Sequence, residues 1–104
     1  MYAVQISDRA TFANKAKEIG GPVVVVRTAT AIPVQQGSAV LMHPAVTIDY
    51  AIEFEDRTMG QTRWTFREVV LTDERGEALI SDSLWRMLSE KSIPVRIIQR
   101  SGSF

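Results

Sequence analysis

The clearest structural pattern lies in Val46-Thr47-Ile48-Asp49-Tyr50-Ala51-Ile52-Glu53-Phe54-Glu55, where apolar residues alternate with polar or small ones along the whole length. Its even-numbered residues are aliphatic or aromatic, whereas its odd-numbered residues are small or acidic. Successive side chains of a strand point to opposite faces of a sheet. The pattern therefore predicts a long strand with one face in the core and the other in water.

A second strand is expected directly after this one. The segment Asp56–Gly60 is typical of a turn, and the next run places Trp64 and Phe66 on one face and Arg63 and Arg67 on the other. The two runs together predict an antiparallel hairpin.

The register of the hairpin has two alternatives. In one, Glu53 lies opposite Arg63 and Asp49 lies opposite Arg67, so that charges pair on one face and large apolar residues pair on the other. In the second, shifted by two residues, Glu55 lies opposite Arg63. Both registers satisfy the pattern.

The apolar residues change phase at the end of the second strand. Val69 and Leu71 have the opposite parity to Trp64 and Phe66. A β-bulge near Arg67-Glu68, or burial of both faces at that end, would account for the change.

The N-terminal segment predicts a strand, a helix and a strand in succession. Tyr2–Ile6 alternates, and Ser7-Asp8 offers capping oxygens to a helix over Arg9–Ile19. Gly20-Gly21-Pro22 would end that helix. Val23–Val26 is a β-branched run suited to a central strand covered on both faces. These elements predict a βαβ unit with parallel strands.

The segment Thr28–Ser38 contains small and polar residues and predicts a surface loop. A short strand over Ala39–Met42 is expected after it.

The C-terminal part predicts a turn, a helix and a last strand. The turn lies at Asp73–Gly76, and Ser81-Asp82 would cap a helix that runs until Ile93-Pro94. A final strand is expected at Val95–Gln99.

The whole order predicts an α+β fold, a two-layer sandwich in which a mixed, mostly antiparallel sheet of five to six strands carries two helices on one face. The order of elements, β-α-β-(β)-β-β-α-β, resembles a ferredoxin-like sandwich enlarged by one or two strands. We expect a single domain over residues 1–100 and a flexible tail over 101–104.

The composition excludes several classes of function. Lys plus Arg and Asp plus Glu number twelve each, so a net charge of zero gives no general attraction to nucleic acid or to an anionic membrane. The absence of cysteine excludes disulfides, thiol catalysis and cysteine-ligated metals. We find neither a signal peptide nor a membrane helix, and we expect a cytoplasmic protein.

No residue pattern predicts a catalytic, metal or cofactor site. His43 is the only histidine, which excludes a histidine pair on a metal within one chain. Asp49, Glu53 and Glu55 are interpreted as a solvated strand face paired with arginines. Gly20-Gly21 would end a helix, whereas a phosphate site needs a helix that begins. An enzyme completed across a dimer interface by His43 and carboxylates is the least favoured hypothesis.

The first hypothesis for function is a non-enzymatic protein-interaction module, a small accessory or inhibitor protein that occludes a partner protein and forms a homodimer. The residues expected to bind the partner are Gln35, Gln36, Arg63, Arg67 and Arg96. The alternative is a nucleic-acid-binding domain. Its arginines would be Arg27, Arg63, Arg67, Arg96 and Arg100.

Overall fold

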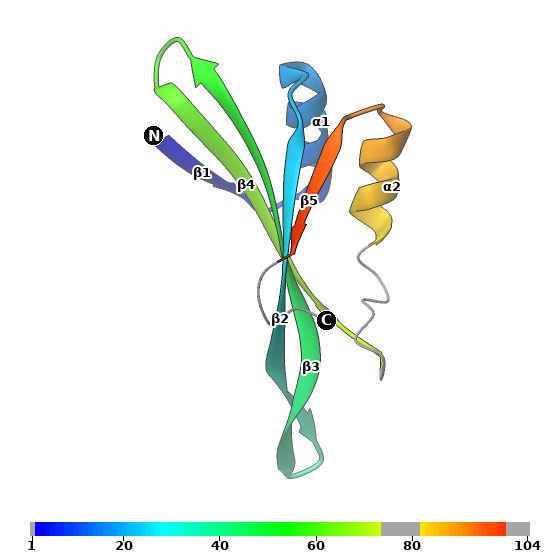
Figure 1. Ribbon diagram of the computed structural model, residues 1–104. Coiled ribbons are helices and arrows are strands. Elements are labelled where there is room, and N and C mark those ends of the chain that lie inside the picture. The colour runs from blue at the N-terminus through cyan, green and yellow to red at the C-terminus, as the bar shows by residue number, and fades with distance from the viewer. Residues whose placement is uncertain (1, 74–81, 100–104) are drawn as a thin grey trace.

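The computed structural model describes residues 2–73 and 82–99, which form a small α+β fold (Figure 1). The elements of this part of the chain are β1 (Tyr2–Ile6), α1 (Arg9–Ile19), β2 (Val23–Gln36), β3 (Ala39–Asp56), β4 (Gly60–Leu71), α2 (Asp82–Glu90) and β5 (Val95–Gln99). The sheet is the dominant element. It has five strands and contains both parallel and antiparallel pairings.

The strand order of the sheet is β1-β4-β3-β2-β5. β3 runs antiparallel to both of its neighbours, whereas each edge strand runs parallel to the strand beside it. β1 and β2 therefore point in the same direction, as a βαβ unit requires, but β4 and β3 lie between them. The same holds for β4 and β5, which are separated by β3 and β2.

The β3–β4 hairpin has the first of the two predicted registers. Glu53 lies opposite Arg63 and Asp49 lies opposite Arg67, and the shifted register is wrong. The pairing continues without a bulge through Val69 and Leu71, which are exposed on the side of the sheet away from the core. The predicted bulge and the predicted burial of both faces are therefore wrong.

The apolar pattern of β4 is interrupted at Glu68, a polar residue on the core side of the strand. This residue explains why the alternation of apolar residues is lost after Phe66. Tyr50 donates its hydroxyl hydrogen to Glu68 Oε1 at 2.7 Å. Arg9 of α1 places its Nη2 3.9 Å from Glu68 Oε2, and its other Nη donates to Ser83 Oγ of α2. This group of side chains joins β3 and β4 to both helices.

Both helices pack against the same face of the sheet, which we call the core face. Phe12 of α1 lies 6.2 Å, between ring centroids, from both Tyr50 and Phe66. Leu84 and Leu88 of α2 are fully buried in the same cluster. The opposite face, which we call the open face, carries the even-numbered residues of β2 and β5 and the odd-numbered residues of β1, β3 and β4.

Val23–Val26 forms an internal strand, but the prediction that both of its faces are covered is wrong. Val23 and Val25 are buried in the core. Val24 and Val26 lie on the open face and are half-buried, because no helix of the described part of the chain packs there. A run of valines indicates a strand, and it does not reveal how many faces of that strand are covered.

The helix ends follow local signals. Asp8 caps α1, with side-chain oxygens that accept from the backbone N–H groups of Ala10 and Thr11, and Gly20 ends it at φ 74°. The second helix ends at Glu90, earlier than predicted. Ser92 adopts φ 57°, and the N–H of Ile93 donates to Leu88 O at 3.0 Å, a Schellman-type ending that stops the helix before the proline.

The predicted loop Thr28–Ser38 is wrong, because residues 28–36 continue β2 and pair one by one with β3. A two-residue turn at Gly37-Ser38 joins the strands, and Gly37 has φ 61°, as the first central position of a type II′ turn requires. The expected short strand over Ala39–Met42 is the first part of β3.

Residues 28–44 form a projection that we call the arm. Among the described residues, β2 has no partner in β5 beyond Arg27, and β3 has none in β4 before Ala45. One hydrogen bond, from Thr72 N to Pro44 O at 3.2 Å, joins the base of the arm to the end of β4. The arm therefore extends from the body of the sheet as a two-stranded ribbon (Figure 1), and the molecule measures 52 × 26 × 26 Å.

Several predictions fall on residues outside the described part of the chain. They are most of the turn at Asp73–Gly76, the capping residue Ser81, Arg100 and the tail over 101–104.

Candidate interaction surfaces

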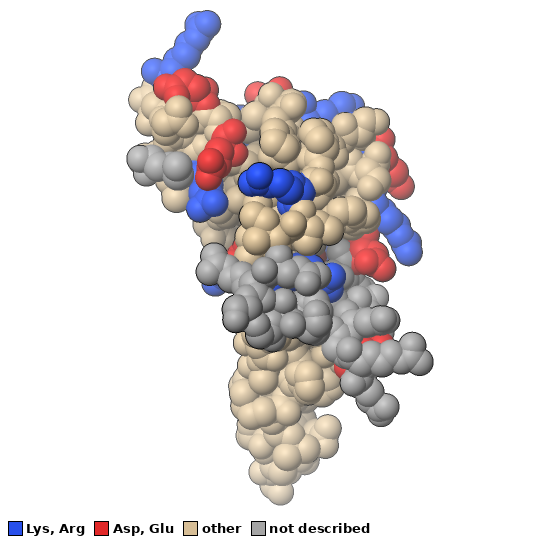
Figure 2. All heavy atoms as spheres, in the orientation of Figure 1, with Lys and Arg blue, Asp and Glu red and all other residues tan. Residues whose placement is uncertain are grey.

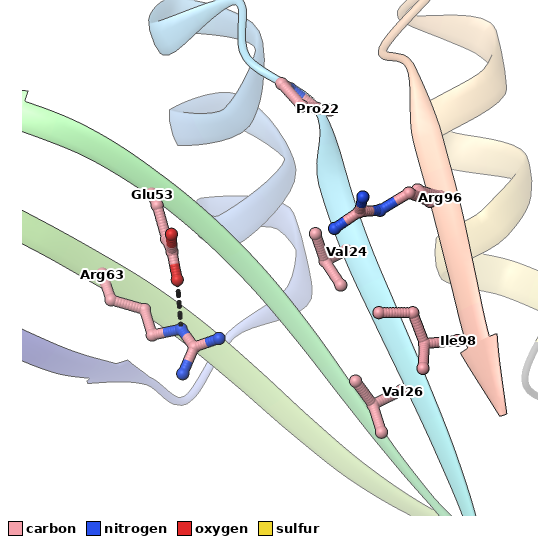
Figure 3. Close-up of a pocket in the computed structure, with 7 residues that line it drawn as sticks. All are labelled: Pro22, Val24, Val26, Glu53, Arg63, Arg96 and Ile98. Atoms are coloured by element: carbon pink, nitrogen blue, oxygen red, sulfur yellow. Dashed lines mark ion pairs between the residues drawn. The ribbon is translucent and has the colours of Figure 1, made fainter. Parts of the chain in front are cut away.

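The centre of the open face is apolar and its margins are charged (Figure 3). Val24 and Val26 project from β2, and Ile98 projects from β5 beside them. Ala51 of β3 lies opposite Val24. A shallow cavity of about 930 Å³ is lined by Val24, Val26, Ile98 and Pro22 and by three charged residues. Ile98 is 42% exposed.

Two ion pairs cross from β3 to β4 on this face. Arg67 holds Asp49 with two hydrogen bonds, of 2.6 Å from Nε and 3.2 Å from Nη2. The carboxylate of Asp49 raises the pKa of the Arg67 guanidinium through these hydrogen bonds. Arg63 Nε lies 3.1 Å from Glu53 Oε1, and the Glu53 side chain remains 51% exposed. About half of the Glu53 side chain is therefore accessible from outside.

Arg96 is the third arginine of the open face, and its surroundings differ from those of the other two. It lies on β5 opposite Val24, and its guanidinium extends across β2 (Figure 3). It takes part in none of the ion pairs of the described residues. The open face thus carries a cation on β5, apolar residues on β2 and carboxylates on β3.

The arm is the second unusual surface. No Asp, Glu, Lys or Arg occurs from Thr28 to Ile48. The projecting end of the molecule accordingly shows no Lys, Arg, Asp or Glu side chain, whereas these residues are plentiful on the body (Figure 2). Val40, Leu41 and Met42 are 63%, 52% and 64% exposed. The arm therefore offers a continuous uncharged surface with large apolar side chains.

The structure divides the predicted partner-binding residues between these two surfaces. Arg63, Arg67 and Arg96 share the open face. Gln35 and Gln36 lie at the tip of the arm, where the Gln35 amide donates to Gly37 O at 3.2 Å. Arg96 lies opposite Val24 of β2, and Gln36 lies twelve residues farther along β2. Twelve residues of a strand span roughly 40 Å. The two glutamines and the three arginines therefore cannot form one site.

The arginines expected to bind nucleic acid are not all on one face. Arg27 lies on the core side of β2 and lines a small cavity with Tyr50 and Trp85, whereas Arg63, Arg67 and Arg96 lie on the open face. The remaining residue of that prediction, Arg100, lies outside the described residues.

Sequence reasoning missed Val40, Leu41 and Met42 as surface residues. The signal that would have found them is the absence of charge from Thr28 to Ile48, in a chain of which 23% is charged. Strands that face water on one side normally carry charged residues there, so a strand pair without any is a candidate for contact with another molecule.

Residues 2–73 and 82–99 show neither a metal-binding cluster nor a membrane-spanning helix. Within these ranges no group of three or more His, Asp or Glu side chains could hold a metal ion. His43 places its Nδ1 2.8 Å from Pro44 O. Neither of the two helices described has the length and apolar character needed to cross a membrane.

No protein-family model, curated protein or solved structure matches this chain.

Proposed function

We propose that the chain is a non-enzymatic protein-interaction module, a small cytoplasmic accessory or inhibitor protein that forms a homodimer and occludes a surface of another protein with its arm. The observation that carries this proposal is the exposure of Val40, Leu41 and Met42 on a ribbon without charged residues. An exposed apolar surface of this kind is typical of a site for protein contact.

The isolated position of the arm supports contact with a partner. Two-stranded ribbons are only marginally stable in water unless a third strand or another element covers them. Proteins usually protect exposed strand edges with charged residues, and the arm has only Pro33 and Pro44 in that role. An apolar cleft or the edge of a sheet in the partner would cover the side chains and the backbone groups together.

The shape of the arm supports occlusion as the mode of action. Residues 28–36 of β2 would reach about 30 Å at the rise of an extended strand. The turn at Gly37-Ser38 makes the tip narrow. A projection of this length and width fits into a cleft of another protein.

A matched pair of methionines tests the proposal. Met42 lies on the arm and is 64% exposed, whereas Met59 lies in the β3–β4 turn and is 48% exposed. A photo-reactive amino acid at either position, followed by mass spectrometry of the cross-linked products from host lysate, would identify the partner. We expect one partner to be linked from position 42 and not from position 59.

Binding to the purified partner would then be measured by calorimetry. We expect Met42→Lys to weaken the affinity by about tenfold or more, because a charge would be buried in an apolar contact, and Met59→Lys to leave it unchanged. Equal affinities of the two variants would contradict the proposal.

A second candidate function is nucleic-acid binding by the open face, favoured by the common position of Arg63, Arg67 and Arg96. Asp49 and Glu53 on the same face repel phosphates and make this candidate the weaker one. Binding of single- and double-stranded oligonucleotides that weakens steeply with salt would support it. A flat salt response would remove it.

For the fold itself we propose the finer description of an enlarged ferredoxin-like two-layer sandwich. The order of elements and the shared face of the two helices support it. The separation of parallel strands by others also fits, since split βαβ units have this property.

A further inference from the structure

The open face resembles the contact surface of a protein interface in its arrangement. Its centre carries Val24, Val26 and Ile98, and charged side chains surround them. Interfaces typically have such an apolar centre within a polar rim. The solvated face of a sheet, in contrast, normally carries polar residues throughout.

Across the open face, the cation of β5 and the carboxylates of β3 lie on either side of β2. β5 carries Arg96, which has no ion pair with any described residue, and β3 carries Asp49 and Glu53. β2, with Val24 and Val26, lies between the cation and the carboxylates. A face with this order is complementary to itself when one copy is rotated by half a turn about β2.

The rotation brings specific residues together. When two open faces pack as aligned sheets about a two-fold axis along β2, β5 of one copy covers β3 of the other. Arg96 and Ala51 lie at the same level along the strands, because both are opposite Val24. Glu53 is two residues beyond Ala51, about 7 Å along the strand, which an extended arginine side chain covers. Val24 and Val26 then meet their counterparts near the axis.

We infer that the open face binds the open face of a second copy of this chain, with Arg96 of each copy paired to Glu53 of the partner subunit. The Glu53 side chain, which is 51% exposed, accepts this second cation beside Arg63. The inference deepens the homodimer of the proposed function by naming its surface, and it assigns no role to the arm.

The mass of the purified protein in solution is the first test. Light scattering and sedimentation over a series of concentrations should show a monomer–dimer equilibrium or a stable dimer. A protein that stays monomeric at the highest concentration measured would overturn the inference.

Charge reversal tests the pairing of Arg96 with Glu53. Arg96→Glu alone places two carboxylates together at each pair, and Glu53→Arg alone places two guanidinium groups together. Each single variant should therefore dimerise with a Kd raised by about tenfold or more. When the two single variants are mixed, both contacts again join opposite charges, so a heterodimer should form with an affinity near that of the wild type.

The mixing experiment also separates the inference from a fault in folding. Single variants that dimerise like the wild type, or a mixture that fails to associate although circular dichroism shows both variants folded, would overturn the inference. Arg86→Glu is the matched control, because Arg86 is exposed on α2 on the other side of the sheet and the change in net charge is the same. We expect no effect of Arg86→Glu on dimerisation.

Failure of this inference and failure of the proposed function have different signatures. The variant Met42→Lys should dimerise normally, because the arm lies outside the open face. Arg96→Glu should keep its affinity for a partner that binds the arm. Oligonucleotide binding that is lost in Arg96→Glu would assign the open face to nucleic acid and overturn the dimer.

Discussion

Tyr50 lies in the middle of the core and also donates a hydrogen bond. Its hydroxyl group reaches Glu68 Oε1 at 2.7 Å, and the Glu68 side chain is only 9% exposed. Burial, together with this hydrogen bond to a carboxylate, raises the pKa of the Tyr50 hydroxyl well above its ordinary value. The hydroxyl therefore stays protonated and available as a donor at neutral pH.

Removal of this hydroxyl should destabilise the fold. Tyr50→Phe leaves the buried carboxylate of Glu68 without its donor, and we expect the free energy of unfolding to fall by about 1–3 kcal/mol in urea titrations at neutral pH. Tyr2→Phe is the matched control, because Tyr2 is 52% exposed, and it should change the value by less than about 0.5 kcal/mol. Equal effects of the two changes would show that Tyr50 does not support Glu68.

Asp8 makes part of the stability depend on pH. A hydrogen bond from the Thr11 hydroxyl and one from the Ala10 backbone lower the pKa of Asp8 from its ordinary 3.8. Since the pKa is lower in the folded state, Asp8 contributes stability above about pH 4 and loses it as the pH falls through the folded value.

The variant Asp8→Ala checks this direction. It should unfold at a lower urea concentration than the wild type at pH 7, because α1 loses its cap. The difference between the two proteins should stay constant down to about pH 5 and shrink below pH 4. A difference that stays unchanged in acid would contradict the contribution of the charged carboxylate.

At the scale of elements, the two helices end in different ways. Gly20 ends α1 at φ 74°, a conformation that glycine adopts without steric cost. Ser92 has φ 57° in the corresponding position after α2. The Cβ atom of serine crowds the carbonyl oxygen in this conformation. The end of the second helix is therefore less stable with serine than it would be with glycine.

Exchanging these residue types should have opposite effects. We expect Ser92→Gly to raise the free energy of unfolding by about 0.5 kcal/mol and Gly20→Ser to lower it by about 1 kcal/mol. Thermal and urea unfolding of both variants would show whether the free energy of unfolding rises or falls. A destabilising Ser92→Gly would mean that the serine side chain itself supports the helix end.

The β3–β4 hairpin shows how packing and charge select one register. On its core side, Tyr50 lies opposite Phe66, with ring centroids 6.0 Å apart, and on its open side Arg67 meets Asp49. A shift by two residues would keep one charge pair and lose the placement of Phe66 against Phe12. The helix therefore contributes to a choice that the two strands alone leave open.

At the scale of the whole molecule, the body and the arm are separate in their packing. The core cluster has members on both sides of the arm, Val25 and Val46, but none within residues 28–44. Folding of the body should therefore not require the arm.

A shortened variant tests this separation. Replacing residues 31–44 by Asn-Gly would join Thr30 to Ala45, which already pair, through a turn that suits a hairpin. We expect cooperative unfolding with a free energy within about 1 kcal/mol of the wild type, and a maximum dimension well below 52 Å in X-ray scattering. Loss of cooperative unfolding would show that the arm belongs to the core.

The elements that depend on neighbouring residues could be predicted from the sequence alone. The predictions of a strand over 46–55, of a helix cap at Asp8 and of a helix end at Gly20 are confirmed. Strand faces and helix ends are set within a few residues, so local patterns are sufficient to predict them. The parity of Arg63 and Arg67 likewise placed both on one face of β4.

Three features could not be predicted from the sequence: the strand order, the extended strand over residues 28–36, and the exposure of the open face. Each of these depends on partners that are distant in the chain. Thr28–Gln36 becomes a strand because β3 supplies its hydrogen bonds, and Val24 stays half-buried because both helices pack on the other face. Arg96 joins Arg63 on one surface only because β5 lies beside β2, and no local pattern contains that pairing.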